Sequence, residues 1–502
     1  MWRRGRVGAR RPAPRRLRPA RHRARGTAPG CSDPPRLRRP PVGLFHHCRA
    51  PTLRCARPRA ATLVSAFPQI REDVVASRTK TLRPERSARP LPAVLAVCVV
   101  ALSLSVAPAY AAASSGSSTT RTSSASTIAS IVRATMSQYQ LRAVIVRVTR
   151  GNTVLTTQAF GTSMDGVTAN TAMHFRNGAV AFEYVSTLLL VYVDEHKVTL
   201  NETIDHWLPD LPESHQVTLK MLANQTSGYP DFETDPTWNA QFNSNPFQIF
   251  SYRERLNEAF NRPVQFAPGT NWSYSHTNFM ILGKILSMIG EAPLATLLQR
   301  KVLAPMGLTQ TTATRTSGIP TPVLHSFSSE RRAALGVPDS TSFYEESTFW
   351  NAQWGTPDGA SETTDISDMT KTALAVGTGK VLTRSSYHAM TDPNLLGFGQ
   401  KQLNCVPSCF TQIPAYNYGL GVVRSGSWLL QNPLLGGYSA SEAYLPSKKI
   451  AVAVVTTFKP GAFDCQGNYS NTSDVLWRKI AASLAPDDAP TPSPAQPPTG
   501  CS

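Results

Sequence analysis

Three adjacent residues, Tyr274, Ser275 and His276, carry side chains suited to acid–base or nucleophilic chemistry. Imidazole titrates near neutral pH, so His276 is the natural general base of the three. A serine hydroxyl is a weak nucleophile without such a base. Because side chains of adjacent residues often point apart, we expect His276 to be a polar residue of the site rather than the base for Ser275.

Two further serines lie in glycine-containing turns. Ser227 lies between Thr226 and Gly228, a pattern typical of a turn after a helix. Gly437 lies two residues before Ser439, but Ser441 stands where the nucleophile elbow Gly-x-Ser-x-Gly requires its second glycine. We therefore expect both serines to be structural.

The hydrophobic pattern predicts the elements that position these residues. Apolar residues alternate, or run continuously with Val enrichment, in four predicted strands: Leu141–Arg150, Thr153–Phe160, Tyr418–Leu430 and Ile450–Phe458. Longer periodic runs predict helices over Thr127–Tyr139, Ala179–Glu195, Asn278–Ile289 and Asn471–Leu484. Strands at both chain ends with helices between them predict an α/β (α+β) fold. In it an antiparallel sheet from both chain ends is flanked by helices and carries a helical insert.

Six segments resemble, in order, the serine β-lactamase, D-alanyl-D-alanine carboxypeptidase and esterase superfamily, and its class C branch most closely. These segments are His174–Gly178, Asp205–Pro212, Val217–Asp231, Phe266–Gly283, Val302–Thr311 and Ala443–Val455. The resemblance implies a serine β-lactamase/transpeptidase-like fold for a domain over residues 127–484.

The same resemblance implies three catalytic elements, and this sequence departs from each. Where the superfamily has Ser-x-x-Lys at the start of a buried helix, Ala179 and Phe182 stand at the serine and lysine positions. Its Tyr-x-Asn element corresponds to Tyr274-Ser275-His276. Its Lys-Thr-Gly or His-x-Gly element corresponds to Gln431-Asn432-Pro433. Tyr274 is thus the one catalytic residue of these three elements that the sequence retains.

Two functions follow as hypotheses. Without a lysine to stabilise its phenolate, Tyr274 is a poor base and is expected to be vestigial. The chain is then a non-catalytic binding protein of the cell envelope. Its ligand would be a peptidoglycan stem peptide, another small peptide or ester-like ligand, or a protein partner. The alternative is an active serine hydrolase of esterase, peptidase or β-lactamase type that uses a non-standard nucleophile such as Ser275.

The positive charge of the chain is confined to its N-terminal part. Residues 1–90 hold 24 Lys and Arg against 4 Asp and Glu, whereas residues 91–502 hold 27 against 28. We therefore expect no nucleic-acid partner. An apolar core within residues 91–111, ending at Ala109-Tyr110-Ala111, is typical of a signal peptide and predicts secretion without a stable membrane span. Because a signal peptide works from the N-terminus, we interpret residues 1–90 as a translation start placed too early.

The rest of the secreted chain is expected to hold a Ser/Thr-rich linker over residues 112–126 and a disordered Pro-rich tail over residues 485–502. Four cysteines follow the signal peptide: Cys405, Cys409, Cys465 and Cys501. Three pairings are open, including Cys405 with Cys409 across a tight loop. No histidine lies at zinc-ligand spacing from them, so we expect no metal and no cofactor.

Overall fold

The computed structural model describes residues 115–314, 316–351, 356–357, 361–405 and 407–498. The predicted signal peptide and basic leader lie outside these residues. The helices are α1 (Ser115–Gln138), α2 (Val180–Asp194), α3 (Leu219–Ala223), α4 (Pro236–Ser244), α5 (Tyr252–Phe260), α6 (His276–Ile289), α7 (Leu294–Leu298), α8 (Ala304–Met306), α9 (Ile366–Gly377), α10 (Arg384–Thr391) and α11 (Thr472–Leu484).

The strands follow the predicted pattern at both ends of the chain. They are β1 (Leu141–Arg150), β2 (Thr153–Met164), β3 (Val167–Thr168), β4 (Phe175–Arg176), β5 (Thr312–Thr314), β6 (Phe327–Ser328), β7 (Glu345–Glu346), β8 (Ser361–Thr364), β9 (Asn417–Tyr418), β10 (Val423–Ser425), β11 (Trp428–Gln431), β12 (Leu434–Leu435), β13 (Tyr438–Leu445) and β14 (Ile450–Phe458). The predicted strands over 141–150 and 450–458 have the bounds of β1 and β14.

The main antiparallel sheet joins the two ends of the chain. Its order is β3-β2-β1-β14-β13-β11-β10-β9, with β12 paired to β13, so the last strand inserts beside the first. In register, Ile145 lies opposite Val455 and Val148 opposite Val452. This confirms the α/β (α+β) prediction of an antiparallel sheet built from both chain ends.

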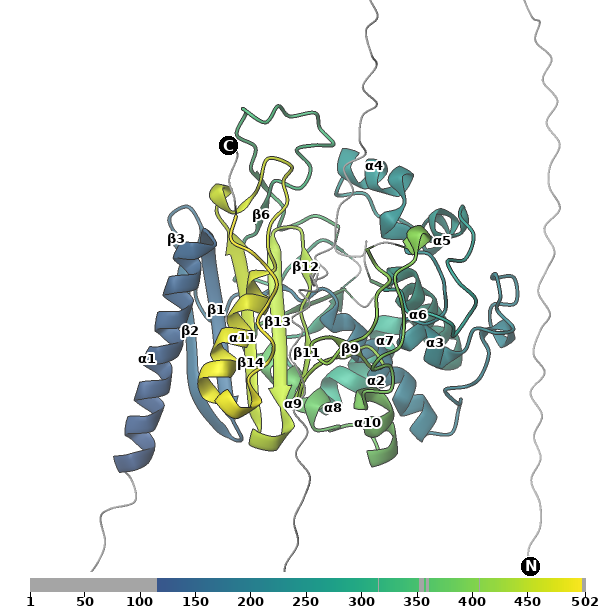
Figure 1. Cartoon of the computed structure of the whole chain (residues 1–502), viewed down its shortest axis with the longest axis horizontal. Helices are drawn as coiled ribbons and strands as arrows, with labels where there is room; N and C mark the ends of the chain where they lie inside the picture. Colours follow the sequence, from purple (N-terminus) through teal and green to yellow (C-terminus); the bar gives the residue numbers. More distant parts are fainter. Residues whose placement is uncertain (1–114, 315, 352–355, 358–360, 406, 499–502) are drawn as a thin grey trace, which may run out of the picture. The chain divides into compact units, whose positions relative to one another are not determined.

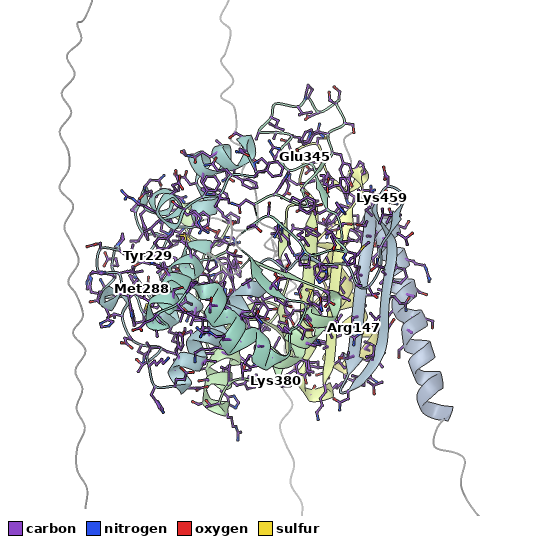
Figure 2. All side chains as sticks on the ribbon, turned by 180° about the vertical axis from the view of Figure 1, so that it is seen from behind. Arg147, Tyr229, Met288, Glu345, Lys380 and Lys459 are labelled. Carbon is purple, nitrogen blue, oxygen red and sulfur yellow. A yellow bond between two sulfur atoms is a disulfide. The ribbon has the colours of Figure 1, made fainter. Side chains whose placement is uncertain are left out.

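Helices cover both faces of this sheet, and the rest of the helices gather beyond one edge. Helices α1 and α11 pack together on one face, and α9 packs against β1, β13 and β14. Figure 1 shows α2 to α8 and α10 grouped to one side of the sheet. Seen from behind, Tyr229 and Met288 mark this helical side and Arg147 and Lys459 mark the sheet (Figure 2). Because helices cover both faces of the sheet, β14 is buried along its whole length and not on one face alone.

Three local expectations were wrong. Helix α1 begins at Ser115, so most of the expected linker over residues 112–126 is helical. Once the packed turns around Ile128 and Val132 form a helix, adding further turns costs little. The expected single strand 418–430 divides into β9, β10 and β11, because Gly421 and Gly426 take positive φ angles of 73° and 60°.

The third wrong expectation concerns the Pro-rich tail, which packs on the domain through the described residues up to 498. Trp428 Nε1–H donates to the Asp488 carbonyl at 2.7 Å, and Tyr139 donates to the Ala495 carbonyl at 3.0 Å. Composition favoured disorder, but backbone carbonyls of the tail find buried donors on the domain.

Within the described residues, no single helix has the length and hydropathy for a membrane span; α6 with residues 294–306 meets both only as a pair bent by 75°.

Candidate functional site

The start of α2 lies against the segment that follows β11. Ala179 is the N-cap residue directly before this helix, and Phe182 N–H donates to its carbonyl at 3.0 Å. Gly178 has φ of +50°, and a Cβ there would lie 2.6 Å from Pro433 Cβ. Such an approach is possible only for glycine. The structure therefore places Gly178, the residue before Ala179, directly against Pro433.

Phe182 fills the space one helical turn after Ala179. Its side chain is fully buried, and its ring stacks on Phe279 of α6 with centroids 3.9 Å apart and planes 3° apart. The rings of Tyr274 and His276 lie 6.1 Å and 5.9 Å away. Phe182 is thus the apolar centre of an aromatic cluster between α2 and α6.

Tyr274 lies in this cluster and is 8 % exposed. Burial raises its pKa well above 10, and the neighbouring Tyr418 and the carboxylates of Glu233 and Asp231 act in the same direction. The phenol therefore stays protonated at neutral pH, which is opposite to what a base requires.

Ser275 and His276 are adjacent in sequence, but their side chains have different surroundings. Ser275 is fully buried, its N–H donates to Gln225 Oε1 at 3.1 Å, and its hydroxyl has no partner among the described residues. His276 opens α6 and directs Nδ1 to Asp231 Oδ2 at 2.8 Å and to Glu233 Oε2 at 3.2 Å. No hydrogen bond joins the two side chains in the described part of the chain.

The two carboxylates decide the charge of His276. Burial alone would lower its pKa, but the charges of Glu233 and Asp231 and the hydrogen bond to Asp231 outweigh it and raise the pKa to about 9. Burial raises the pKa of Glu233 to about 7, against the opposing charge of His276. At neutral pH His276 is therefore an imidazolium that donates protons and cannot accept one.

Asp231 and Glu233 are site residues that sequence reasoning missed. Their carboxylate oxygens and a His276 ring nitrogen lie within 4.8 Å of one another, a spacing that could hold a divalent ion. A metal needs a neutral imidazole, so it would have to displace the proton that now joins His276 to Asp231. The sequence signal was the Asp-x-Glu spacing, which the short turn over Phe232–Thr234 brings to one side.

The residues expected at the third element take part in local hydrogen bonds. Gln431 Nε2 donates to the Gly421 carbonyl at 2.5 Å, and Asn432 Nδ2 donates to Asp474 Oδ1 at 3.1 Å. The side chains of Gln431 and Asn432 are thus used in joining β11 to the neighbouring loop and to α11.

The other serines of the turns are also engaged. Ser227 Oγ donates to Asn278 Oδ1 at 2.5 Å, and Ser439 Oγ donates to Asn471 Oδ1 at 2.7 Å. Both are fully buried. Among the described residues neither hydroxyl forms a hydrogen bond with a histidine, and both hydroxyls hold neighbouring segments together.

A second buried acid pair lies behind the aromatic cluster. Glu183 follows Phe182 on α2 and is fully buried beside Glu442 of β13, which is 2 % exposed. Burial raises the pKa of both carboxyl groups, and the charge of Glu442 raises that of Glu183 further, so the pair keeps at least one proton at neutral pH. Sequence reasoning missed this pair because a glutamate in an apolar helix gives no sign of its partner strand.

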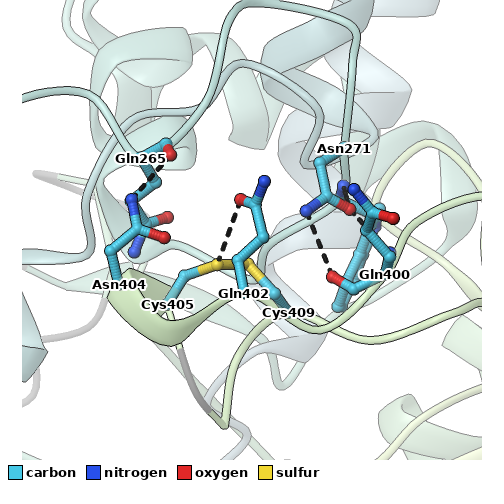
Figure 3. Close-up of a disulfide and its surroundings, with 8 residues drawn as sticks. Gln265, Asn271, Gln400, Gln402, Asn404, Cys405 and Cys409 are labelled. Carbon is cyan, nitrogen blue, oxygen red and sulfur yellow. Dashed lines mark hydrogen bonds between the residues drawn. A yellow bond between two sulfur atoms is a disulfide. The ribbon is translucent and has the colours of Figure 1, made fainter.

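A disulfide supports the segment that carries Tyr274. Cys405 is bonded to Cys409, which settles one of the open pairings, and Cys465 is disulfide-bonded as well. Cys409 forms a β-bridge with Ser273, and Tyr274 N–H donates to the Ser408 carbonyl at 3.4 Å. Figure 3 shows the side-chain hydrogen bonds around it, including Asn404 Nδ2 to the Gln265 carbonyl at 2.7 Å.

Residues 128–475 match the family model described as Beta-lactamase, which covers well over half of the chain. The chain belongs to the β-lactamase family. Solved structures agree on the fold. D-amino acid amidase of Ochrobactrum anthropi superposes with a TM-score of 0.59 at 19 % identity, covering 72 % of this chain and 99 % of that one. A penicillin-binding protein homologue of Pyrococcus abyssi gives a TM-score of 0.56 at 15 % identity, covering 73 % and 79 %.

Curated relatives match the chain over shorter stretches. Lovastatin esterase of Penicillium rubens is 32 % identical over 104 residues, which are 20 % of this chain and 25 % of that protein. Penicillin-binding protein 4* of Bacillus subtilis is 26 % identical over 112 residues, 22 % of this chain and 24 % of that one. The matched part thus spans about a quarter of each relative, and family membership rests on the model over residues 128–475.

Proposed function

We propose that this member of the β-lactamase family is a secreted, non-catalytic protein of the cell envelope. In this proposal it binds a stem peptide, or another small peptide or ester-like ligand, without cleaving it. Ala179 and Phe182 replace the serine and lysine of the superfamily. The position of Phe182 carries the proposal, because its buried ring stacks on Phe279 where a lysine amine would have to meet Tyr274.

The remaining groups of the site support the absence of catalysis. Tyr274 holds its proton, and His276 is an imidazolium held by two carboxylates. The alternative nucleophile Ser275 is fully buried and has no hydrogen bond to His276 among the described residues. A hydroxyl without a base and without exposure is a poor nucleophile.

Covalent labelling tests the proposal. Purified protein is incubated with a fluorescent penicillin and with a fluorophosphonate, and the intact mass is measured. We expect no adduct at saturating probe. Nitrocefin and p-nitrophenyl esters should be turned over equally by wild type and by Tyr274→Phe, since binding alone can still give roughly 10³-fold background over water. A stoichiometric adduct, or a clear loss of turnover in Tyr274→Phe or Ser275→Ala, would favour the hydrolase.

Two further measurements test the binding and the secretion. A stem-peptide mimic should shift the thermal unfolding of wild type in a saturable way. If peptides cause no shift in thermal unfolding and a protein partner is captured instead, the ligand is a protein and not a small peptide. N-terminal sequencing of secreted protein should begin near Ala112, and a mature form that keeps residues 1–90 would overturn the processing scheme.

A further inference from the structure

Arg176 is a buried cation for which the described part of the chain supplies no anionic partner. It lies on β4, three residues before Ala179, and is 4 % exposed. Its Nη2 donates to the Ser317 carbonyl at 2.5 Å, while Nε and Nη1 have no partner among the described residues. Other buried arginines of the described chain differ in their partners: Arg331 pairs with Glu345 and Arg478 with Asp474, each at 3.0 Å, whereas Arg332 donates to three backbone carbonyls.

The missing partner carries an energetic cost. Burial lowers the pKa of Arg176 to about 10, against the effect of Tyr438, so the guanidinium is still charged at neutral pH. A buried charge without a counter-ion is strongly unfavourable, because the interior does not replace the solvation that the charge has in water. Unused guanidinium donors in a buried place therefore indicate that something with a lone pair, and preferably a negative charge, belongs beside them.

A small pocket lies at this guanidinium. Arg176 lines it together with Ser347, Asn351 and Tyr438, and Trp350, Leu435 and Gly436 form the rest of the wall. Tyr438 does not supply the missing charge, because its hydroxyl donates to the Leu324 carbonyl and burial raises its pKa above the ordinary value. Ser347 Oγ donates to the Gly436 carbonyl at 2.6 Å and is neutral. Arg176 is thus the charged residue of the pocket wall.

We propose that this pocket binds a small monovalent anion, which is either chloride or the carboxylate group of a ligand. Arg176 holds the anion through Nε–H or Nη1–H, and the apolar wall of Trp350 and Leu435 limits its size. The pocket adjoins the candidate site, since Leu435 Cδ2 lies 2.8 Å from where a Cβ of Gly178 would stand. The inference does not depend on whether the site is catalytic.

Anion titrations test the proposal. Thermal unfolding is followed in a bulky sulfonate buffer at constant ionic strength while sodium chloride, sodium acetate or N-acetyl-D-alanine is added. We expect a saturable rise in Tm for wild type. Saturation by chloride with no tighter response to the carboxylates assigns a bound inorganic ion, and tighter saturation by the carboxylates assigns a ligand carboxylate.

Matched variants separate the pocket from general salt effects. Arg176→Met should raise the apparent Kd at least tenfold, whereas Arg478→Met removes a buried arginine that has its own carboxylate and should keep the response. The absence of saturation in wild type, or an unchanged response in Arg176→Met, overturns the proposal. If Arg176→Met does not fold, a bromide-soaked crystal of wild type decides: an anomalous peak within hydrogen-bonding distance of Arg176 is expected, and water in its place refutes the anion. Covalent labelling plays no part in these readouts, so their failure is distinct from failure of the non-catalytic function.

Discussion

Replacing His276 by asparagine tests the charge assignment at the centre of the site. The substitution keeps a polar side chain at this position and removes the imidazolium that lies 2.8 Å from Asp231 and 3.2 Å from Glu233. A rise of the His276 pKa from 6.5 to about 9 corresponds to roughly 3 kcal/mol of stabilisation of the charged form. Most of this is present at pH 7. We therefore expect His276→Asn to lower the free energy of unfolding by about 3 kcal/mol at that pH, since it removes the positive charge that the carboxylates of Asp231 and Glu233 share.

The pH dependence has a definite sign. Because the pKa of His276 is raised in the folded state, its contribution is complete below the unfolded value of 6.5 and is lost as the pH rises through about 9. Urea unfolding at pH 7 measures the energy, and an NMR titration of the His276 ring measures the midpoint. The control is His388→Asn, which removes a half-exposed histidine 3.3 Å from Asp392 and should change stability by no more than about 0.5 kcal/mol. A His276 midpoint at or below 6.5, or equal losses in both variants, would refute the charge assignment.

Three further predictions concern the same region. Ala179→Ser alone should give no labelling by a fluorescent penicillin, whereas Ala179→Ser combined with Phe182→Lys should give some. The double variant should lose about 3–5 kcal/mol of unfolding free energy, because it lacks the buried phenyl ring. Strong labelling of the single variant would show that another base serves the site. Because the pKa of Glu442 is raised in the folded state, the stability of wild type should fall as the pH rises above the pKa that this group has in the unfolded chain. In urea unfolding, Glu442→Gln should therefore be more stable than wild type at pH 9 but not at pH 5. An equal pH dependence of the unfolding free energy in the two proteins would count against the buried pair. Replacing Cys405 and Cys409 by alanine opens a loop of sequence separation 4 and should cost about 2 kcal/mol by chain entropy. Reductant should therefore lower the Tm of wild type by more than that of the variant, which keeps the disulfide of Cys465.

Much of the fold could be predicted because it depends on local patterns. The alternation and Val-rich runs of 141–150 and 450–458 specify strands wherever they lie, and both have the predicted bounds. Errors arose where a local signal competed with packing. The Ser/Thr-rich stretch before Thr127 has low helix propensity, yet it continues α1 because the helix is already formed by the packed turns after it.

The candidate site divides in the same way. The sequence alone indicated Ala179 and Phe182 at the start of a buried helix and Tyr274-Ser275-His276 before another, because these positions follow from order and spacing along the chain. Only the tertiary structure decided that His276 contacts Asp231 and Glu233, residues more than forty positions earlier. It also decided that Phe182 stacks on Phe279 and that Glu183 faces Glu442.

The physical reason is that charge and reactivity are properties of surroundings. The groups that packing brings within a few ångströms decide whether a histidine is a neutral base or an imidazolium. They likewise decide whether an arginine is a surface cation or one partner of a buried ion pair. Residue type and spacing along the chain determined which groups this protein has at the start of α2 and α6. Only when β4, α6 and the turn at Asp231 came together in the folded chain was it decided that Arg176 is buried with no carboxylate among the described residues and that His276 contacts two.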